Sequence, residues 1–164
     1  MSLPKPLDGD PVPVDTRLLR LPKPPPDFRP ESWRPTWQLF EPSTRDKRHA
    51  EERRQRVRVS VWDEMRTTAA EARTFRDGPT IVVRVGVQEA LDIAARHRHA
   101  LAILYDPLDP PDDTHPGADG HSGIEGLERA KAQPKPEWRK LLEDLAKLAD
   151  LLEGPVDLPP RAGG

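Results

Sequence analysis

Proline limits what the first quarter of this chain can fold into. Of the 21 prolines, 11 lie in the range 1–42. Each proline removes a backbone hydrogen-bond donor and pushes the residue before it towards extended geometry. The stretch 22–30, PKPPPDFRP, favours polyproline II. The sequence therefore predicts an arm over residues 1–42 that is largely extended or disordered and lies outside the compact domain.

The arm is not uniformly polar, because large apolar side chains are scattered through its second half. Two Trp and two Phe lie in the range 28–40, more than a purely solvated linker would need. We therefore expect residues 28–40 to lie as an extended strap against the domain or on a partner protein. The predicted partner-binding residues are Trp33, Trp37 and Phe40.

Residues 43–56 form a highly charged stretch, STRDKRHAEERRQR, without an apolar stripe. We expect a solvated helical connector supported by side-chain pairs four residues apart. A nucleic-acid surface would need aromatic side chains between the arginines to stack bases, and this stretch has none. With a net charge of −2 for the whole chain, nucleic acid is not an expected partner.

The block from residue 57 to 153 has the periodicity of a compact domain. Val57, Val59 and Val61 alternate with polar residues, which is typical of a strand with one wet face. Thr68 and Glu71 match a capping box. We expect strands at 57–62, 80–85 and 101–105, the last one central, and helices at 68–76 and 87–99. This β-α-β-α-β order with short connections predicts an α/β fold with parallel strands, and an α+β arrangement is the alternative.

The clearest helix follows Pro136 and runs to the Gly154-Pro155 stop. Its apolar residues recur at spacings of three and four, and charged residues take the opposite side. We predict that this C-terminal amphipathic helix packs on the sheet, the alternative being a helix that docks on a partner. Residues 154–164 are expected to be a disordered tail. The apolar stripe comprises Trp138, Leu141, Leu142, Leu145, Leu148, Ala149 and Leu152.

The segment 106–128 carries seven acids, two histidines and no Lys or Arg. It is rich in Pro and Gly, so we expect an acidic loop and neither a helix nor a core strand. Within it, His115, Asp119 and His121 are the candidate ligands of a divalent metal such as Zn, Mn or Mg. Their spacing meets no established metal-site rule. The competing interpretation is turn chemistry, with histidines that are solvated or that cap backbone groups.

Two further acids follow predicted strands. Asp63 comes after the strand at 57–62, and Asp106 comes after the strand at 101–105. In a parallel sheet both carboxylates would lie at one edge, where open α/β folds bind ligands and where Mg²⁺ could be held. They are therefore the candidate catalytic residues. The simpler interpretation is that Asp terminates strands before a turn, since no nucleophile or phosphate-binding motif accompanies it.

The composition restricts the functional class. The chain has no Cys, which excludes disulfides and thiolate chemistry. No apolar run approaches the length that a membrane-spanning helix needs, and the start of the chain has no signal-peptide core. We therefore expect a cytoplasmic protein.

No motif set identifies a family. The modest core and the apolar residues of the arm favour a non-enzymatic interaction protein without a cofactor, which binds another protein through the N-terminal arm. We expect such a protein to belong to a larger bacterial assembly or to a defence or toxin-type locus. The alternative is a divalent-metal-dependent hydrolase or nuclease that uses the loop 106–128.

Overall fold

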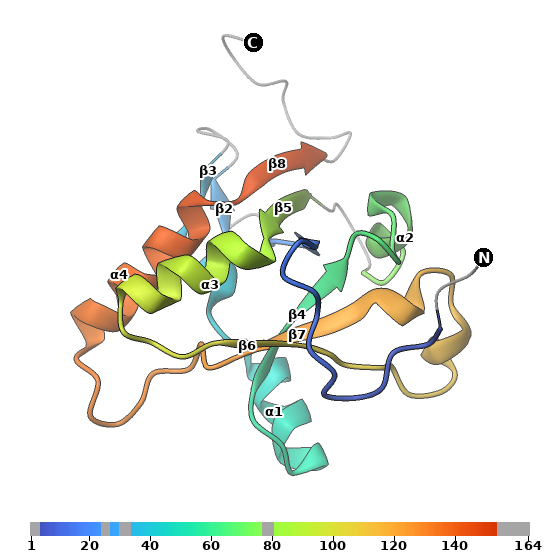
Figure 1. The fold of residues 1–164 in the computed structure, drawn as a ribbon, viewed down its shortest axis with the longest axis horizontal. Helices are drawn as coiled ribbons and strands as arrows, with labels where there is room; N and C mark the ends of the chain where they lie inside the picture. Colours follow the sequence, from blue (N-terminus) through green and yellow to red (C-terminus); the bar gives the residue numbers. More distant parts are fainter. Residues whose placement is uncertain (1–3, 24–26, 30–33, 77–80, 154–164) are drawn as a thin grey trace, which may run out of the picture.

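A six-stranded antiparallel sheet forms the centre of the molecule (Figure 1). The computed structural model describes residues 4–23, 27–29, 34–76 and 81–153. In spatial order the strands are β6 (Ala102–Tyr105), β7 (His121–Glu125), β4 (Arg58–Asp63), β1 (Arg17–Arg20), β5 (Val82–Gly86) and β8 (Asp150–Glu153). A separate ribbon pairs β2 (Phe28–Arg29) with β3 (Arg34–Pro35).

The helices lie between these strands in sequence. The α-helices are α1 (Thr44–Arg53), α2 (Ala69–Arg73), α3 (Val87–Arg96) and α4 (Lys135–Lys147). Short 3-10 helices are η1 (Trp37–Phe40), η2 (Asp112–Thr114) and η3 (Ala118–Gly120). The predicted capping box is confirmed at α2, where the Thr68 hydroxyl accepts from Glu71 N and the Glu71 carboxylate accepts from Thr68 N. Among the described residues, no helix is both long and apolar enough to cross a membrane.

The α+β alternative is correct, and the parallel sheet is wrong. The three predicted strands β4, β5 and β6 do run in one direction, because β1 pairs antiparallel with both β4 and β5, and β7 with both β4 and β6. None of the three pairs with another. The antiparallel strand β1 lies between β4 and β5, and the antiparallel strand β7 lies between β4 and β6. Neither of these two strands was predicted.

The first unpredicted strand is β1, which lies within the proline-rich N-terminal region. Residues 14–21 are the longest proline-free run between Pro4 and Pro35, and their backbone donors are therefore available for pairing. Leu18 and Leu19 of this run are fully buried. The range 1–42 thus differs from the expected separate arm, since part of it forms a central strand.

The N-terminal segment also covers one edge of the sheet. Gly9 N donates to Tyr105 O, Tyr105 N to Asp10 O, and Val12 N to Ile103 O. Beyond this cover, β6 is the outermost strand on its side, and its predicted central position is wrong. Apolar character all along β6 is explained by this cover and by packing against the core. The outer edge of β6 is therefore occupied by the chain's own residues 9–12.

The second unpredicted strand is β7, which is buried throughout although it lies in the segment expected to be a polar loop. Its polar side chains have partners inside the protein. Ser122 donates to Gly120 O, and Glu125 lies directly opposite Arg58 in the β4–β7 pairing. Gly123 leaves room for Arg58, because a Cβ there would come within 2.6 Å of the Arg58 Cβ. Paired polar residues can therefore occupy a central strand.

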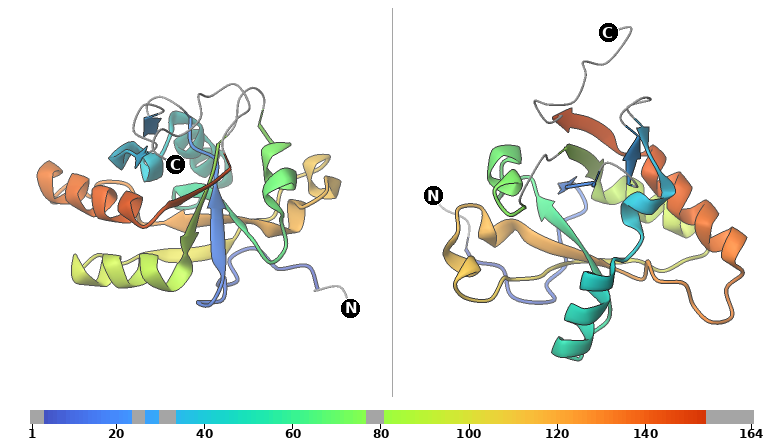
Figure 2. Two further views of the ribbon diagram at one scale, coloured as in Figure 1. Left: turned by 90° about the horizontal axis from the view of Figure 1, so that it is seen from above. Right: turned by 180° about the vertical axis from the view of Figure 1, so that it is seen from behind.

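Helices cover the two sides of the sheet differently, as the view from above shows (Figure 2). α3 and α4, together with η1, pack on one side over the larger apolar core, and α2 packs on the other side. The C-terminal helix is packed and not free, since its side chains Trp138, Leu141, Leu142 and Leu145 are buried, and its main neighbours are η1 and α3. The helix ends at Lys147, earlier than predicted, because the chain then turns into the edge strand β8.

Several predictions fall on residues that the structure does not describe. They are Trp33, part of the polyproline stretch, the first residue of the strand predicted at 80–85 and the tail 154–164.

Candidate functional site: a polar cluster on one face of the sheet

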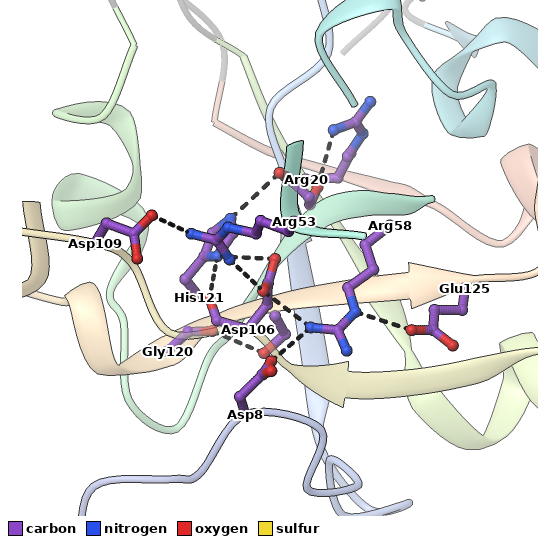
Figure 3. A network of polar contacts seen from close by, with 11 residues as sticks. Asp8, Arg20, Arg53, Arg58, Asp106, Asp109, Gly120, His121 and Glu125 are labelled. Carbon is purple, nitrogen blue, oxygen red and sulfur yellow. Dashed lines mark hydrogen bonds and ion pairs between the residues drawn. The ribbon is translucent and has the colours of Figure 1, made fainter. Parts of the chain in front are cut away.

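Eight polar side chains form one connected set of contacts on the face of the sheet opposite α3 and α4, and Figure 3 labels all of them except Ser60. We call them the polar cluster. Strand alternation places Arg58 and Ser60 of β4 on the same face, and the β4–β7 register brings His121 and Glu125 beside them. The cluster comprises Asp8, Arg53, Arg58, Ser60, Asp106, Asp109, His121 and Glu125.

Arg58 is the centre of the ion pairs. Its Nη1 lies 2.9 Å from Asp106 Oδ1 and 2.7 Å from Asp8 Oδ1, and its Nε lies 2.9 Å from Glu125 Oε2. Burial acts to lower the pKa of this guanidinium, but hydrogen bonds to Asp8 and Glu125 outweigh it and hold the pKa above its ordinary value. Arg58 therefore joins the N-terminal segment, β4, β7 and the end of β6.

A second guanidinium comes from the last residue of α1. Arg53 Nη1 lies 3.2 Å from Asp106 Oδ1, and its Nη2 lies 2.7 Å from Asp109 Oδ2. Asp106 thus binds both Arg53 and Arg58. Because the Asp106 side chain is only 11 % exposed, these two cations compensate a carboxylate that has lost most of its water.

His121 connects Asp106 to Ser60. Its Nδ1 lies 2.6 Å from the Asp106 carbonyl oxygen, which can only accept, so Nδ1 carries the proton of the neutral ring. The other nitrogen, Nε2, is then an acceptor and lies 3.2 Å from Ser60 Oγ. Burial lowers the pKa of His121 and favours this neutral form. The geometry places an unprotonated ring nitrogen against a serine hydroxyl.

The structure places the two predicted catalytic acids in separate contacts. Asp106 belongs to the polar cluster. Asp63 is 2 % exposed and accepts hydrogen bonds from Tyr105 Oη at 2.6 Å and from Met65 N at 2.8 Å. Burial, followed by the hydrogen bond to Asp63, raises the pKa of Tyr105. Asp63 therefore ends β4 and anchors the following turn, as the simpler interpretation of an Asp before a turn expects.

The three predicted metal ligands are not gathered around one point. His115 Nε2 lies 2.6 Å from Thr74 Oγ1, and its ring packs edge-on against Phe75. Phe75 stacks on Trp62, and Trp62 in turn contacts His121, so two aromatic rings lie between the histidines. Asp119 and His115 line one shallow hollow together with Lys5 and Arg66, and His121 lies outside it. Within the described ranges, no group of three His, Asp or Glu side chains is placed to hold a metal ion.

The predicted partner-binding residues have different surroundings. Phe40 is 2 % exposed and lies in the core. Trp37 is half-buried; its ring meets Trp138 edge-on at a centroid distance of 5.9 Å, and the guanidinium of Arg139 lies 4.5 Å from its centroid. Trp37 is thus the one of the two described aromatics that reaches the surface.

Arg139 also borders a hollow of about 420 Å³ on the exposed side of α4. Its lining residues are Lys135, Pro136, Arg139, Lys140 and Glu143. We call Trp37, Lys135, Arg139 and Lys140 the basic–aromatic surface. All three cations are exposed.

Sequence reasoning missed Arg53, Arg58 and Ser60 as members of a site. The alternation in β4 placed Arg58 and Ser60 on the polar side of a strand, but nothing local shows which distant segment meets them. That information lies in the β4–β7 register, which places Arg58 opposite Glu125 and Ser60 opposite Gly123, so that Ser60 meets His121 diagonally across the two strands.

The comparisons with known proteins add no relative. No protein-family model matches the chain, and neither a curated protein nor a solved structure does. The functional argument therefore rests on the geometry of the chain itself.

Proposed function

We propose that this chain is a protein-interaction component that binds an acidic segment of a partner protein through the basic–aromatic surface. The observation that carries the proposal is the stack of Arg139 on the half-buried Trp37 ring beside a hollow lined by two further cations. Tryptophan and arginine are among the residues most enriched where interfaces derive their affinity.

The electrostatics of the molecule support this choice of surface. Arg53 and Arg58 are occupied by carboxylates of the same chain, so the polar cluster offers no spare cation. On α4, by contrast, Lys135 and Arg139 form none of the ion pairs found among the described residues. Lys140, whose side chain is itself exposed, lies 4.0 Å from Glu143 and 3.4 Å from the partly exposed Asp144, and such surface contacts are weakly held. A carboxylate-bearing partner can displace such contacts.

The packing of α4 determines which side of this helix a partner protein could contact. Its apolar stripe is buried in the core and is not available to a partner. What remains at the surface is the charged side of the helix together with the edge of Trp37. The proposed interface therefore combines one aromatic ring with charged side chains. The N-terminal region contributes the ring of Trp37. The acidic groups of the partner would face the three cations.

The expected setting is still a larger bacterial assembly or a defence or toxin-type locus. The alternative of a metal-dependent hydrolase has less support, because His115 and His121 bind different groups of the protein.

Charge reversal on α4 tests the proposal. Wild-type protein and the double variant Lys135→Glu/Arg139→Glu are used as baits in affinity purification, followed by direct binding measurements with each purified candidate. We expect the partner to be lost with the double variant, and an acidic peptide from that partner to compete. The matched control is Lys147→Glu, which reverses a charge at the other end of the same helix. A partner retained equally by all three proteins would refute the assignment of this surface.

A further inference from the structure

We propose that Ser60 is a nucleophile and that, with His121 as its general base, this chain hydrolyses small uncharged carboxylic esters without a metal ion. This activity is independent of the docking surface on α4 and does not rest on it. The argument depends on three features of the polar cluster: the tautomer of His121, the position of Ser60 and the local charge.

The tautomer is set by a backbone carbonyl. Because Asp106 O can only accept, the 2.6 Å contact fixes the proton of the neutral imidazole on Nδ1 and leaves the Nε2 lone pair facing Ser60 Oγ at 3.2 Å. This is the relation between base and nucleophile that activates a serine. Asp106 acts as a positioning residue through its carbonyl, and its carboxylate Oδ2 lies farther away, 3.8 Å from Nδ1.

Ser60 is only partly buried, whereas its base is held rigidly. Ser60 is half-buried on the polar face of β4, whereas His121 is only 8 % exposed. Edge-on packing against Trp62 fixes the imidazole, with ring centroids 4.7 Å apart. A nucleophile that is only partly buried and a base locked by packing are the requirements for a preorganised site.

The chemical step balances without a further reactant besides water. Ser60 Oγ attacks the ester carbonyl carbon and its proton moves to His121 Nε2. The bond from the carbonyl carbon to the leaving oxygen then breaks, and the alcohol leaves with that proton. Water, deprotonated by the same nitrogen, attacks the acyl-serine, and collapse releases the carboxylic acid and returns the proton to Ser60.

The charge of the cluster indicates the class of ester. Four carboxylates, those of Asp8, Asp106, Asp109 and Glu125, surround two guanidiniums, which leaves a net charge of −2 while His121 is neutral. An anionic ester would be repelled by this balance. A small uncharged ester is therefore the expected substrate.

Labelling of the wild-type protein is the first test, and it needs no variant that could fail to fold. Purified full chain is treated with a fluorophosphonate, which phosphonylates activated serines with loss of fluoride, and the modified peptide is mapped by mass spectrometry. We expect modification at Ser60. Absence of labelling, or labelling confined to another serine, would overturn the proposal.

Hydrolysis of p-nitrophenyl acetate is the second test. Ser60→Ala and His121→Gln should each lower the rate by at least about 100-fold, the usual contribution of a positioned base and its nucleophile. The matched control Ser122→Ala changes a serine of the neighbouring strand that is bound to Gly120 O, and it should keep the wild-type rate. The wild-type rate should rise with pH as His121 loses its proton, with a midpoint below the ordinary histidine value of 6.5. Equal rates in wild type and Ser60→Ala would also overturn the proposal.

Discussion

The two faces of the sheet are stabilised by different balances of apolar burial and ion pairing. On the face covered by α3 and α4, the strands contribute apolar side chains such as Val59, Val61 and Ile124, and the helices close over them. The opposite face has a smaller apolar cluster under α2, which includes Leu19, Trp62 and Val82. Beside it, β4 and β7 contribute Arg58, His121 and other polar groups that are paired with one another, and we call this part the polar face. Apolar burial gains free energy in proportion to the area removed from water, whatever the pH. Paired charges stabilise only while every partner is present and correctly ionised.

This difference predicts which amino-acid substitutions the protein should tolerate on each face of the sheet. A substitution on the apolar face acts through volume and desolvation, and no neighbouring group can compensate. A substitution on the polar face acts through the partner that it leaves behind, so a second substitution can relieve it. The polar face is also where chemistry is possible, because its groups include an acceptor nitrogen and a hydroxyl.

The largest effect is expected from Leu145→Asp on the apolar face. Leu145 is 3 % exposed, so the new carboxylate would be buried without a partner and should cost more than about 3 kcal/mol of unfolding free energy. Thermal melting followed by circular dichroism measures the loss. Lys135→Asp, in the exposed first turn of α4, is the control and should leave the melting temperature nearly unchanged. A folded Leu145→Asp protein with the wild-type melting temperature would contradict the packing of α4.

A smaller loss is expected from Arg58→Met on the polar face. The change leaves Glu125 and part of Asp106 without their guanidinium, which should cost about 2 kcal/mol. Adding Glu125→Gln should restore part of that loss, since the stranded charge is then removed. Urea unfolding of the two single variants and the double variant gives the coupling energy. Arg56→Met, whose contact with Glu128 is 3.7 Å long and exposed, is the control. Additive effects of the two substitutions would show that the pair is not coupled.

The polar face should also give the protein a pH dependence. Because burial lowers the pKa of His121, the unfolded chain binds a proton that the folded chain resists. Stability is therefore retained above about pH 6.5, the unfolded histidine value, and is lost as pH falls below it, by at most about 1.4 kcal/mol per pH unit. Unfolding free energies of wild type and His121→Gln between pH 5 and 8 should converge towards acid. Parallel curves would show that His121 is not the responsible group.

The smallest effect is expected where α3 meets α4. His97 Nε2 lies 2.8 Å from Asp144 Oδ2 at a partly exposed position. Partial burial acts to raise the Asp144 pKa, but the hydrogen bond from His97 and the charge of Lys140 hold it below its ordinary value. The stabilisation by Asp144 is thus fully present at pH values above the carboxyl pKa of the unfolded chain. It is lost as the pH falls through the lower pKa of Asp144 in the folded protein. Asp144→Asn should cost about 0.5 kcal/mol near neutral pH, with Glu143→Gln as control. A loss of unfolding free energy as large as that expected from Arg58→Met would contradict the assignment of the His97–Asp144 contact as a weak surface pair.

Local patterns predicted the elements whose signals lie within one segment. The capping box at Thr68 and Glu71, the alternation in β4 and the stripe of α4 each depend on near neighbours in sequence. The structure has these elements close to their predicted ranges, except that α4 was expected to continue into β8.

The strands β1, β7 and β8 could not be found in the same way. Each is placed by partners far along the chain. The polar residues of β7 resemble a loop until Arg58 and Asp106 are known to be beside them. Of the polar cluster, Asp106 and His121 were singled out by residue type, but the Ser60 contact depends on register, which the sequence alone does not reveal.

The central position of β1 has a consequence for the order of assembly during synthesis. This strand is synthesised well before its two neighbours, β4 and β5, which begin only at Arg58 and Val82. Until both have emerged, the two adjacent leucines of β1 have no sheet to enter and stay exposed to other nascent chains. Closure of the sheet is then a long-range event, which slows folding because the loop entropy is lost before the contacts are gained. The nascent chain is thus most vulnerable to aggregation in the interval before β5 is synthesised.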